Sequence, residues 1–400
     1  MFILVLAILL GQTLGLAVAD VIPNSIQVDN VDMAYLPFPS RQLFQFEQNG
    51  TWIENVAARS NGDLLFTVLQ PAPQLYSMSA VQSKEPQVTL LFEFPDMTGV
   101  LGITEASPDV FVVAGGKFTG TATPVFGTFS LWRVSFADAA VTCKIHCGWS
   151  GKHPSFTKLL NLPDNVYPNG LTSVPDKPGV IFVADSMGSL LRVDVTSGKI
   201  EAVAAVPEMA PVQGWPFLMG INGIKIHDGY VYWTNSFAAT MYRMAIDEDG
   251  YAVPAPSSSS YSLPDTTSTV DVSNPKFTAT LESGNNNSTN VTVETVVSMP
   301  ITFMDDFAIA ENGTLWITTN PNNTVIAYNQ DTGMSAVVGG DQHQETMAGA
   351  NAAVFGRTDS DSHMLYVVTA GGLTSPVNGS FVEPAKVVAI DTKNSADEAL

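Results

Sequence analysis

The 400-residue sequence has few cysteines, histidines and basic residues. Lysine and arginine number 17 against 38 aspartate and glutamate residues, which gives a formal net charge of −21. A field of that sign repels nucleic acids and anionic membranes, so we expect neither as a partner. Zinc-type histidine clusters, a phosphate-binding glycine loop and a nucleophile elbow are also missing. The candidate chemistry therefore rests on carboxylates, amides and aromatic rings.

The only two cysteines are Cys143 and Cys147, in the segment Cys-Lys-Ile-His-Cys. In an oxidising compartment a disulfide between them is the expected state. A metal site that uses His146 is the alternative, but it would have three candidate ligands and no distant fourth. We predict the disulfide.

Long apolar runs are missing except at the start of the chain. Residues 1–19 are uncharged and end in Ala17-Val18-Ala19, which predicts a signal peptide cleaved before Asp20. A membrane anchor is the alternative, although the stretch is short for a span. We expect a secreted or secretory-lumen glycoprotein, because the chain also carries seven Asn-x-Ser/Thr sequons. The sequons are at Asn49, Asn286, Asn287, Asn290, Asn312, Asn322 and Asn378.

Helical periodicity is weak, and one phrase recurs instead: a Gly/Asn/Asp turn between strands of apolar and aromatic residues. Its six copies begin near Glu54, Leu101, Asn169, Asn222, Asp306 and Ala353. A period of about 40 to 50 residues with several strands each is typical of propeller blades. We therefore predict an all-β, six-bladed β-propeller as a single domain over residues 20–400.

The composition also predicts how the ring closes and where it is interrupted. Residues 41–47 alternate polar and apolar, so we expect them to form a strand beside residues 386–391 that closes the ring. Residues from about 250 to 298 are polar and poor in periodicity, which predicts a flexible, glycosylated insertion in the fourth blade. The predicted blades cover residues 50–95, 97–163, 166–208, 217–298, 301–340 and 348–392.

Four of the repeated phrases open with an oxygen-bearing residue: Glu54, Asn169, Asn222 and Asp305. Each stands where the chain enters an innermost strand, a position that points into the channel mouth of a propeller. Two carboxylates and two amides are suited to Ca²⁺, Mg²⁺ or Mn²⁺. The Asn-Gly pairs also favour turns without any ligand, so a structural role is the alternative for both amides. Asp305 and Asp306 are neighbours on a predicted strand and point to opposite faces, so only one of them can face the mouth.

Several large apolar side chains stand just before the inner strands, and packing in the core is the alternative for each. Together they predict an aromatic small-molecule pocket. They are Tyr167, Trp215, Phe217, Met219, Phe303 and Met304. His343 precedes the sixth blade at the corresponding position and is a candidate general acid or base, with a plain surface histidine as the alternative.

These phrases resemble the senescence-marker-protein/gluconolactonase family of six-bladed propellers. Glu54 matches the family's first-blade glutamate, Asn169 and Asn222 match its two Asn-Gly positions, and Asp305 matches its Asp-Gly-Leu-Ala aspartate. Three features depart from the lactonases: Glu-Asn-Val for Glu-Gly-Pro, Asp-Asp-Phe for Asp-Gly-Leu, and a large aromatic loop before Asn222. In these the chain is similar to a fungal exported branch that includes the hetero-Diels–Alderases of tropolonic sesquiterpene biosynthesis.

The resemblance implies a secondary-metabolite cyclase that needs no cofactor and joins a tropolone-derived quinone methide to a humulene-type alkene. The substrate-binding residues would be Tyr167, Asn169, Trp215, Phe217, Asn222, Phe303 and Met304, and the catalytic ones Glu54, Asp305 and His343. The first alternative is a lactonase that holds Ca²⁺, Mg²⁺ or Mn²⁺ through Glu54, Asn169, Asn222 and Asp305. A non-catalytic propeller that binds a small molecule is the second alternative.

Overall fold

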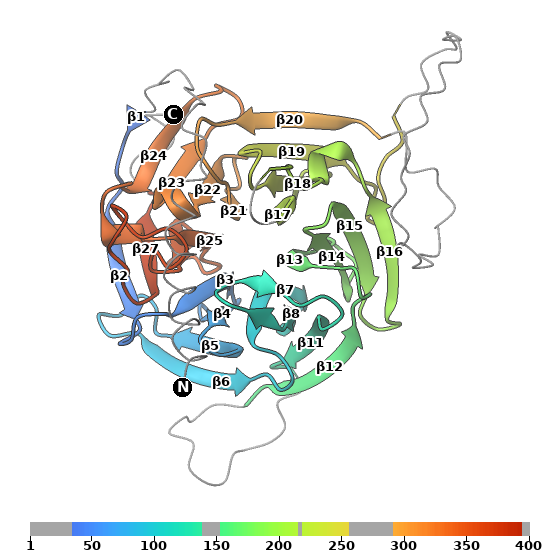
Figure 1. Cartoon of the computed structure of the whole chain (residues 1–400), viewed down its shortest axis with the longest axis horizontal. Helices are drawn as coiled ribbons and strands as arrows, with labels where there is room; N and C mark the ends of the chain where they lie inside the picture. Colours follow the sequence, from blue (N-terminus) through green and yellow to red (C-terminus); the bar gives the residue numbers. More distant parts are fainter. Residues whose placement is uncertain (1–33, 138–152, 215–217, 256–290, 394–400) are drawn as a thin grey trace, which may run out of the picture. The chain divides into compact units, whose positions relative to one another are not determined.

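Six sheets are arranged around a common centre (Figure 1); five have four antiparallel strands, and the sixth has a short N-terminal strand added in parallel to its four antiparallel strands. The structure is a computed structural model, and it describes residues 34–137, 153–214, 218–255 and 291–393. Successive strands of each sheet run from the centre outward, so each sheet is one blade. The prediction of an all-β, six-bladed β-propeller is confirmed.

Each of the first three blades contains four strands in chain order. Blade 1 contains β3 (Trp52–Ala58), β4 (Leu64–Gln70), β5 (Gln74–Ser79) and β6 (Gln87–Glu93). Blade 2 contains β7 (Gly99–Ser107), β8 (Val110–Gly116), β11 (Ser130–Ser135) and β12 (Ser155–Asn161). Blade 3 contains β13 (Pro168–Ser173), β14 (Val180–Asp185), β15 (Ser189–Asp194) and β16 (Lys199–Ala204).

The last three blades complete the ring. Blade 4 contains β17 (Ile221–His227), β18 (Tyr230–Asn235), β19 (Thr240–Ala245) and β20 (Val293–Ser298). Blade 5 contains β21 (Phe307–Ile309), β22 (Leu315–Thr319), β23 (Thr324–Tyr328) and β24 (Ser335–Gly340). Blade 6 contains β25 (Ala350–Phe355), β26 (Met364–Thr369), β27 (Lys386–Asp391) and β2 (Ser40–Gln45).

The ring closes through an N-terminal strand, as predicted. β2 pairs antiparallel with β27, and Arg41 lies opposite Ala389. The preceding short strand β1 (Ala34–Tyr35) pairs in parallel with β24 on the outside of blade 5. The N-terminal segment therefore covers the outer edges of the last two blades, which would otherwise expose unpaired backbone groups.

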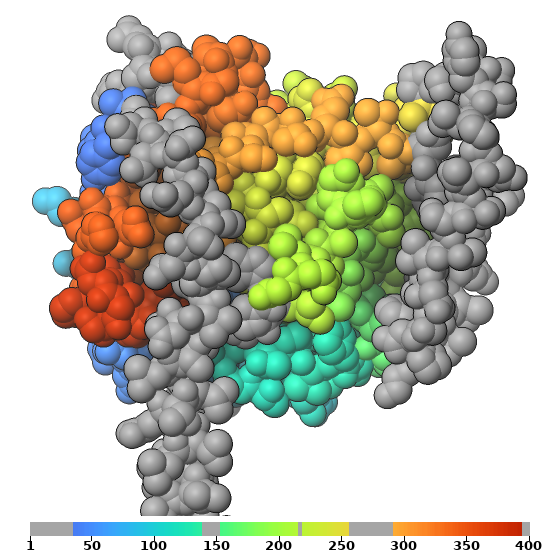
Figure 2. All heavy atoms as spheres, turned by 45° about the horizontal axis from the view of Figure 1, so that its top comes forward, coloured from blue at the N-terminus to red at the C-terminus, as the bar shows by residue number. Residues whose placement is uncertain are grey.

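Apolar side chains between neighbouring blades form the core, and Figure 2 shows the blades packed against one another around the ring. Blades 5 and 6 share a cluster that includes Trp316, Leu365 and Val388. Strand β14, of sequence Val-Ile-Phe-Val-Ala-Asp, is buried at every position because blades cover both of its faces. Each fully buried side chain of this size contributes about 1.5–3 kcal/mol to stability.

The inner strands share an irregularity near their first residues. The pairing register of β3 shifts around Glu54, and that of β13 and β17 shifts at the Asn-Gly pairs. Such bulges re-aim side chains and are common next to active sites. Glycine is needed in both pairs because a Cβ at Gly170 would lie 2.5 Å from the Asn222 oxygen, and one at Gly223 would lie 2.4 Å from Asp306 Oδ1. The Asn-Gly pairs thus occupy bulges where inner strands approach closely.

Several predictions concern residues outside the described ranges. These are the signal peptide at 1–19, residues 256–290 of the insertion, Cys143, Cys147, Trp215, Phe217, Asn286, Asn287 and Asn290. Among the described sequons, Asn49, Asn312 and Asn378 are exposed and Asn322 is half-buried. No helix in the described ranges is long and apolar enough to cross a membrane.

Candidate active site

The starts of the inner strands bring together residues that are far apart in the sequence. Asp305 Oδ1 accepts a hydrogen bond from Asn222 Nδ2 at 2.9 Å, and its Oδ2 accepts one from Asn320 Nδ2 at 3.1 Å. Asn320 opens the short 3-10 helix η2 (Asn320–Asn322) that follows β22. Asp305 is therefore fixed by blade 4 on one side and by a loop of its own blade on the other.

Glu54 and Asp305 form an acid pair whose protons are held tightly. Burial, together with a smaller contribution from the charge of Asp306, raises the pKa of Glu54 to about 7. The Trp52 indole N–H opposes the shift, although it makes no hydrogen bond of good geometry. Burial, and then the charge of Glu54, raise the pKa of Asp305 well above its ordinary value. Two neighbouring buried acids with raised pKa values are typical of catalytic acids and bases.

Asp306 differs from its neighbour because its charge is compensated. Its Oδ1 accepts a 2.6 Å hydrogen bond from Lys225 Nζ, and its Oδ2 accepts one of 3.2 Å from Asn55 Nδ2. The two aspartates precede β21 instead of lying within a strand, so alternation does not send them to opposite faces. Both reach other inner strands: Asp305 reaches Asn222 and Asp306 reaches Lys225, three residues further along β17.

Two amides of this site, Asn351 and Asn320, are not among the residues predicted from the sequence. Asn351 lies at the bulge of β25, as Asn169 and Asn222 do in their strands. Its Nδ2 donates to Ile53 O at 2.7 Å, and its Oδ1 accepts from Asn320. The sequence does contain a signal for Asn351, which stands at the start of the sixth copy of the phrase. It is easily overlooked because alanine follows Asn351, whereas glycine follows Asn169 and Asn222. Asn320 lies in a loop after the second strand of blade 5 and has no counterpart in the repeated phrase.

Threonines on the second strands hold the bulges in place. Thr234 Oγ1 accepts from Gly223 N at 3.0 Å and donates to Asp305 O at 2.6 Å. In the next blade, Thr318 Oγ1 accepts from Asp306 N at 3.2 Å and donates to Asn351 O at 2.6 Å. One hydroxyl thus joins the start of the inner strand in its own blade to the start of the inner strand in the following blade, which pre-organises the acids.

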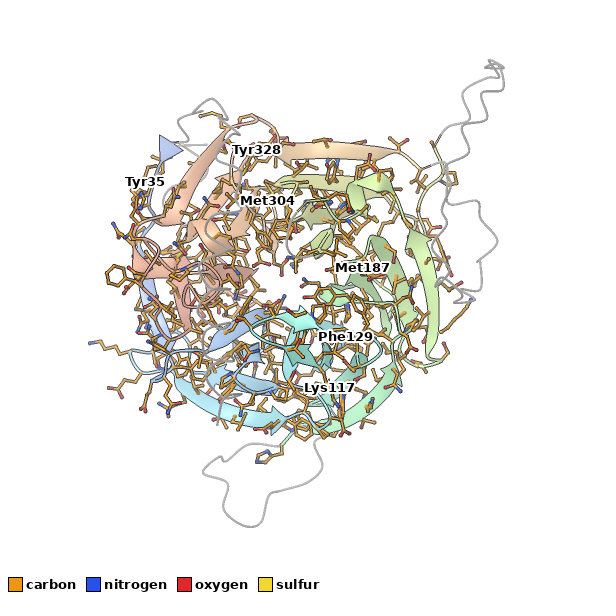
Figure 3. The ribbon with its side chains drawn as sticks, viewed as in Figure 1. Tyr35, Lys117, Phe129, Met187, Met304 and Tyr328 are labelled. Carbon is orange, nitrogen blue, oxygen red and sulfur yellow. The ribbon has the colours of Figure 1, made fainter. Side chains whose placement is uncertain are left out.

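The mouth is apolar on the side of blades 2 and 3. The ring of Tyr167 lies 5.6 Å from that of Phe129 and 6.4 Å from that of Phe118, measured between centroids. Half-buried Met187 and Met219 pack against the same cluster. Figure 3 shows Phe129 and Met187 on this side of the ring. Burial, together with the charges of Glu54 and Asp305, raises the pKa of Tyr167, so its phenol lies near both acids.

Tyr167 and Asn169 retain hydrogen-bonding capacity. Their exposed fractions are 4 % and 5 %. Within the part of the chain that the structure describes, neither the Tyr167 hydroxyl nor the Asn169 amide makes a side-chain hydrogen bond. Buried polar groups normally have partners, so these two are suited to binding a ligand.

The remaining predicted residues divide into three groups. Met304 is fully buried and supports the core, on the blade 5 side of Figure 3. Phe303 is half-buried and packs edge-on against Phe237 at 5.0 Å. His343 is exposed, and its Nδ1 pairs with Asn378 Oδ1 at 2.8 Å. It lines a rim cavity of 410 Å³ over blade 6, and the structure shows no contact between it and the acid pair in the described ranges.

The oxygen set fits a hard divalent cation in chemical type. Asn222 turns its nitrogen to Asp305, which leaves its oxygen available, and a cation would relieve the repulsion between Glu54 and Asp305. Among the described residues, no group of three or more acidic, histidine or cysteine side chains gathers as a metal site. A cation here would therefore depend on Asn169 and Asn222 to complete its ligands.

The comparison with known proteins agrees with the resemblance. No protein-family model matches the chain. It is 26 % identical over 386 residues to a protein of Sarocladium schorii named as a hetero-Diels-Alderase, across 89 % of this chain and 84 % of that one. A Phoma sp. protein of the same name is 26 % identical over 363 residues, across 85 % and 89 % of the two chains. The chain is similar over most of its length to two proteins that are named as hetero-Diels-Alderases. Since both relatives are named as enzymes, the protein is an enzyme.

Solved structures share the fold at low identity. A luciferin-regenerating enzyme has a TM-score of 0.55 with 13 % identity, across 89 % of this chain and 96 % of that one. The calcium-binding protein regucalcin of Agrobacterium tumefaciens has a TM-score of 0.53 with 12 % identity, across 90 % and 97 %. A protein named as a gluconolactonase has a TM-score of 0.51 with 11 % identity, across 90 % and 94 %. These likenesses show the propeller fold alone.

Proposed function

We propose that the protein is a hetero-Diels–Alderase-type cyclase that joins a tropolone-derived quinone methide to a humulene-type alkene. The observation that carries the proposal is one juxtaposition at the mouth: Glu54 and Asp305 stand beside the apolar surface around Tyr167. The names of the two relatives support a cyclase. An apolar surface with a few convergent polar groups is the usual form of a small-molecule site.

The acid pair supplies a proton for the loss of water that creates the reactive diene. A protonated Glu54 donates to the hydroxyl that leaves, the carbon–oxygen bond breaks, and water departs. The neighbouring ring hydroxyl of the precursor then returns its proton to the carboxylate, which restores the acid. With a pKa raised to about 7, Glu54 is a competent donor near neutral pH.

The cycloaddition itself needs positioning. One carbon–carbon and one carbon–oxygen bond form between the quinone methide and the alkene, with no external electrons or protons. Holding two reactants in reactive geometry contributes up to about 7–11 kcal/mol to rate acceleration. The Tyr167 hydroxyl and the Asn169 amide would hydrogen-bond the diene oxygen, while the apolar side of the mouth holds the hydrocarbon. This assigns the acid role to Glu54 and Asp305 and leaves His343 outside the reaction.

The test is a reaction of purified protein with the hydroxylated tropolone precursor and humulene. We expect faster formation of the adduct than in buffer and a single stereoisomer. The variant Tyr167→Phe should slow the addition by about tenfold because it removes one hydrogen-bond donor. Equal rates and equal stereoisomer mixtures with and without protein would contradict the proposal.

A metal-dependent lactonase is the second candidate, because Glu54, Asn169, Asn222 and Asp305 all stand at or just before the first residues of inner strands and carry the oxygen ligands that a hard cation prefers. The bound cation would polarise a lactone carbonyl and activate water. Metal analysis of the purified protein, with lactone hydrolysis measured before and after chelation, separates the two functions. One equivalent of metal together with hydrolysis that chelation abolishes would favour the lactonase.

We further propose that the protein is secreted after cleavage near Asp20 and carries glycans. The exposure of Asn49, Asn312 and Asn378 supports this, because glycans need accessible amides. N-terminal sequencing of the protein from its natural culture medium, with mass analysis before and after glycosidase treatment, checks both points.

A further inference from the structure

A small hairpin extends blade 2 over the mouth. It consists of β9 (Phe118–Thr119) and β10 (Thr123–Pro124), which pair antiparallel between β8 and β11. Gln70 Nε2 of blade 1 donates to Thr121 O at its tip at 2.9 Å. Thr128 Oγ1 accepts from Lys117 N at 2.9 Å and closes its base. The hairpin is therefore held at its base by its own blade and at its tip by the neighbouring blade.

The hairpin presents one aromatic ring inward and another outward. Phe118 is 7 % exposed and belongs to the apolar cluster, whereas Phe126, just after β10, is 46 % exposed. The ring of Phe126 lies 6.5 Å from that of Tyr167, between centroids. Since the phenol of Tyr167 lies near Glu54 and Asp305, Tyr167 connects the exposed ring of Phe126 to the acid pair.

The corresponding positions of the inner strands explain why this side is apolar. Five blades place a polar residue at the bulge or entry of the inner strand, and blade 2 places Leu101 there, buried at 1 % exposure. The six residues in blade order are Glu54, Leu101, Asn169, Asn222, Asp305 and Asn351. Blades 3 to 6 and blade 1 thus form a polar arc at the mouth, and blade 2 leaves an apolar gap in it.

We propose that the hairpin and Phe126 form the subsite for the hydrocarbon partner, and that Phe126 sets the specificity for it. This inference rests on the proposed cyclase function and adds which part of the mouth binds each of the two substrates. The oxygenated partner binds at the polar arc around Asp305, and the alkene lies against Phe126 and Tyr167. A hydrocarbon gains nothing from the amides and acids of the polar arc, whereas it would cover the half-exposed ring of Phe126. Tyr167 lies at the boundary, where the reacting atoms of both partners must meet.

The experiment compares Phe126→Ala with Phe381→Ala, which removes a ring of 55 % exposure from a loop of blade 6. α-Humulene is the probe, and its dissociation constant is measured without the second substrate. Phe126→Ala should weaken humulene binding and raise its KM by about tenfold, while the KM of the oxygenated precursor stays unchanged. Phe126→Leu should fall between this variant and the native protein. Phe381→Ala should leave both substrates unaffected.

The outcomes separate this inference from the proposed function. If Phe126→Ala binds humulene as tightly as Phe381→Ala does, or raises the KM of the oxygenated precursor instead, the subsite is wrong. A change in oligomeric state without a change in humulene binding would assign Phe126 to an interface and would also overturn it. If the native protein gives no adduct, the proposed function fails, whereas humulene binding that depends on Phe126 still supports the apolar subsite.

Discussion

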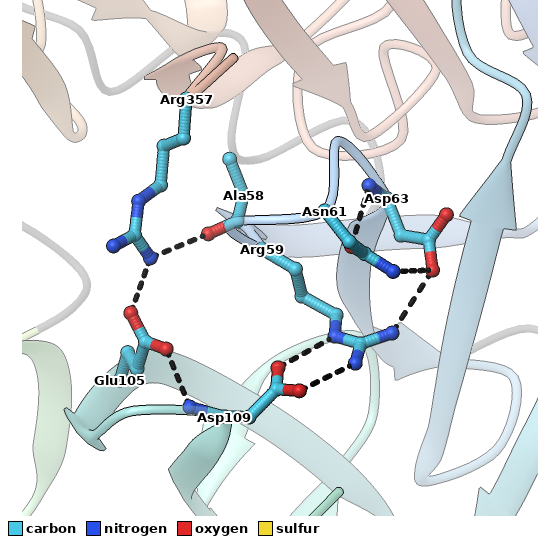
Figure 4. A network of polar contacts seen from close by, with 7 residues as sticks. All are labelled: Ala58, Arg59, Asn61, Asp63, Glu105, Asp109 and Arg357. Atoms are coloured by element: carbon cyan, nitrogen blue, oxygen red, sulfur yellow. Dashed lines mark hydrogen bonds and ion pairs between the residues drawn. The ribbon is translucent and has the colours of Figure 1, made fainter. Parts of the chain in front are cut away.

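The two ends of the inner strands use charged residues in opposite ways. Strand β3 begins near Glu54 at the mouth and is followed by Arg59 at the far end. The guanidinium of Arg59 donates to both oxygens of Asp109, at 3.0 and 2.9 Å, and to Asp63 Oδ2 at 2.9 Å (Figure 4). At the mouth, burial and the charges of neighbouring acids raise the pKa values of Glu54 and Asp305.

The network at the far end extends over three blades. Arg357 of blade 6 donates to Ala58 O of blade 1 at 3.2 Å and pairs with Glu105 of blade 2 (Figure 4). Glu105 in turn accepts from Asp109 N at 2.7 Å. Charges that are fully paired contribute to the cohesion of the blades, whereas acids left without a cation retain a proton that can be transferred. The inner strands therefore carry stabilising ion pairs at the far end and the candidate catalytic acids at the mouth.

The largest expected effect is at the mouth. Glu54→Gln keeps the size of the side chain but removes the proton donor, so the rate of adduct formation should fall by about 10²–10⁴-fold. The melting temperature should stay the same or rise, because a buried acid is lost. The matched control is Glu105→Gln, at the far end of β7, which should retain the rate and lower the stability. A Glu54→Gln enzyme with native activity would remove Glu54 from the mechanism.

At the far end, Arg59→Ala should reduce stability and leave the chemistry intact. The side chain is only 8 % exposed, and its loss leaves Asp63 and Asp109 without their cation. Breaking a buried pair in this way costs about 3–5 kcal/mol of unfolding free energy. Urea denaturation measures this cost, with Arg59→Lys as an intermediate that keeps the charge and loses the two-pronged geometry. A folded Arg59→Ala protein with strongly reduced activity would show that the two ends are coupled.

The raised pKa of Glu54 predicts how both rate and stability depend on pH. The rate should fall as pH rises through about 7, where Glu54 loses its proton. The unfolded chain releases this proton near 4.5 and the folded chain near 7, so the folded state binds more protons between these values. Stability from Glu54 is therefore complete below pH 4.5 and is lost as pH rises to about 7.

The difference between the native protein and Glu54→Gln isolates this contribution, because every other acid is common to both. The two melting temperatures should be close at the acidic end, and the native protein should fall increasingly below Glu54→Gln as pH rises through the interval. Parallel curves would show that Glu54 titrates at its ordinary value.

The smallest expected effect is at His343. Its ring pairs with Asn378 at the rim over blade 6, away from the acid pair. His343→Gln should change the rate of adduct formation by no more than about twofold. Initial rates at saturating substrate test this, and a tenfold loss would return His343 to the active site.

Local sequence patterns were enough to predict the blades, the closing strand and part of the site. The repeat places one residue of each copy at or just before the start of an inner strand. This spacing was enough to predict the positions of Glu54, Asn222 and Asp305. It did not find Asn320, because that residue lies in a loop whose position depends on the fold of blade 5. It also placed His343 at the mouth by analogy of position, whereas the long loop after β26 provides Asn378 as its partner.

The sequence by itself determined the propeller and the set of oxygen-bearing residues at the inner strands, since both depend on short-range periodicity that recurs along the chain. Only the tertiary structure decided which acid is neutralised. Asp305 and Asp306 are neighbours in the chain, yet Lys225 pairs with one and two amides hold the other. Charge and protonation depend on distances between blades, and those distances are fixed only when the ring closes.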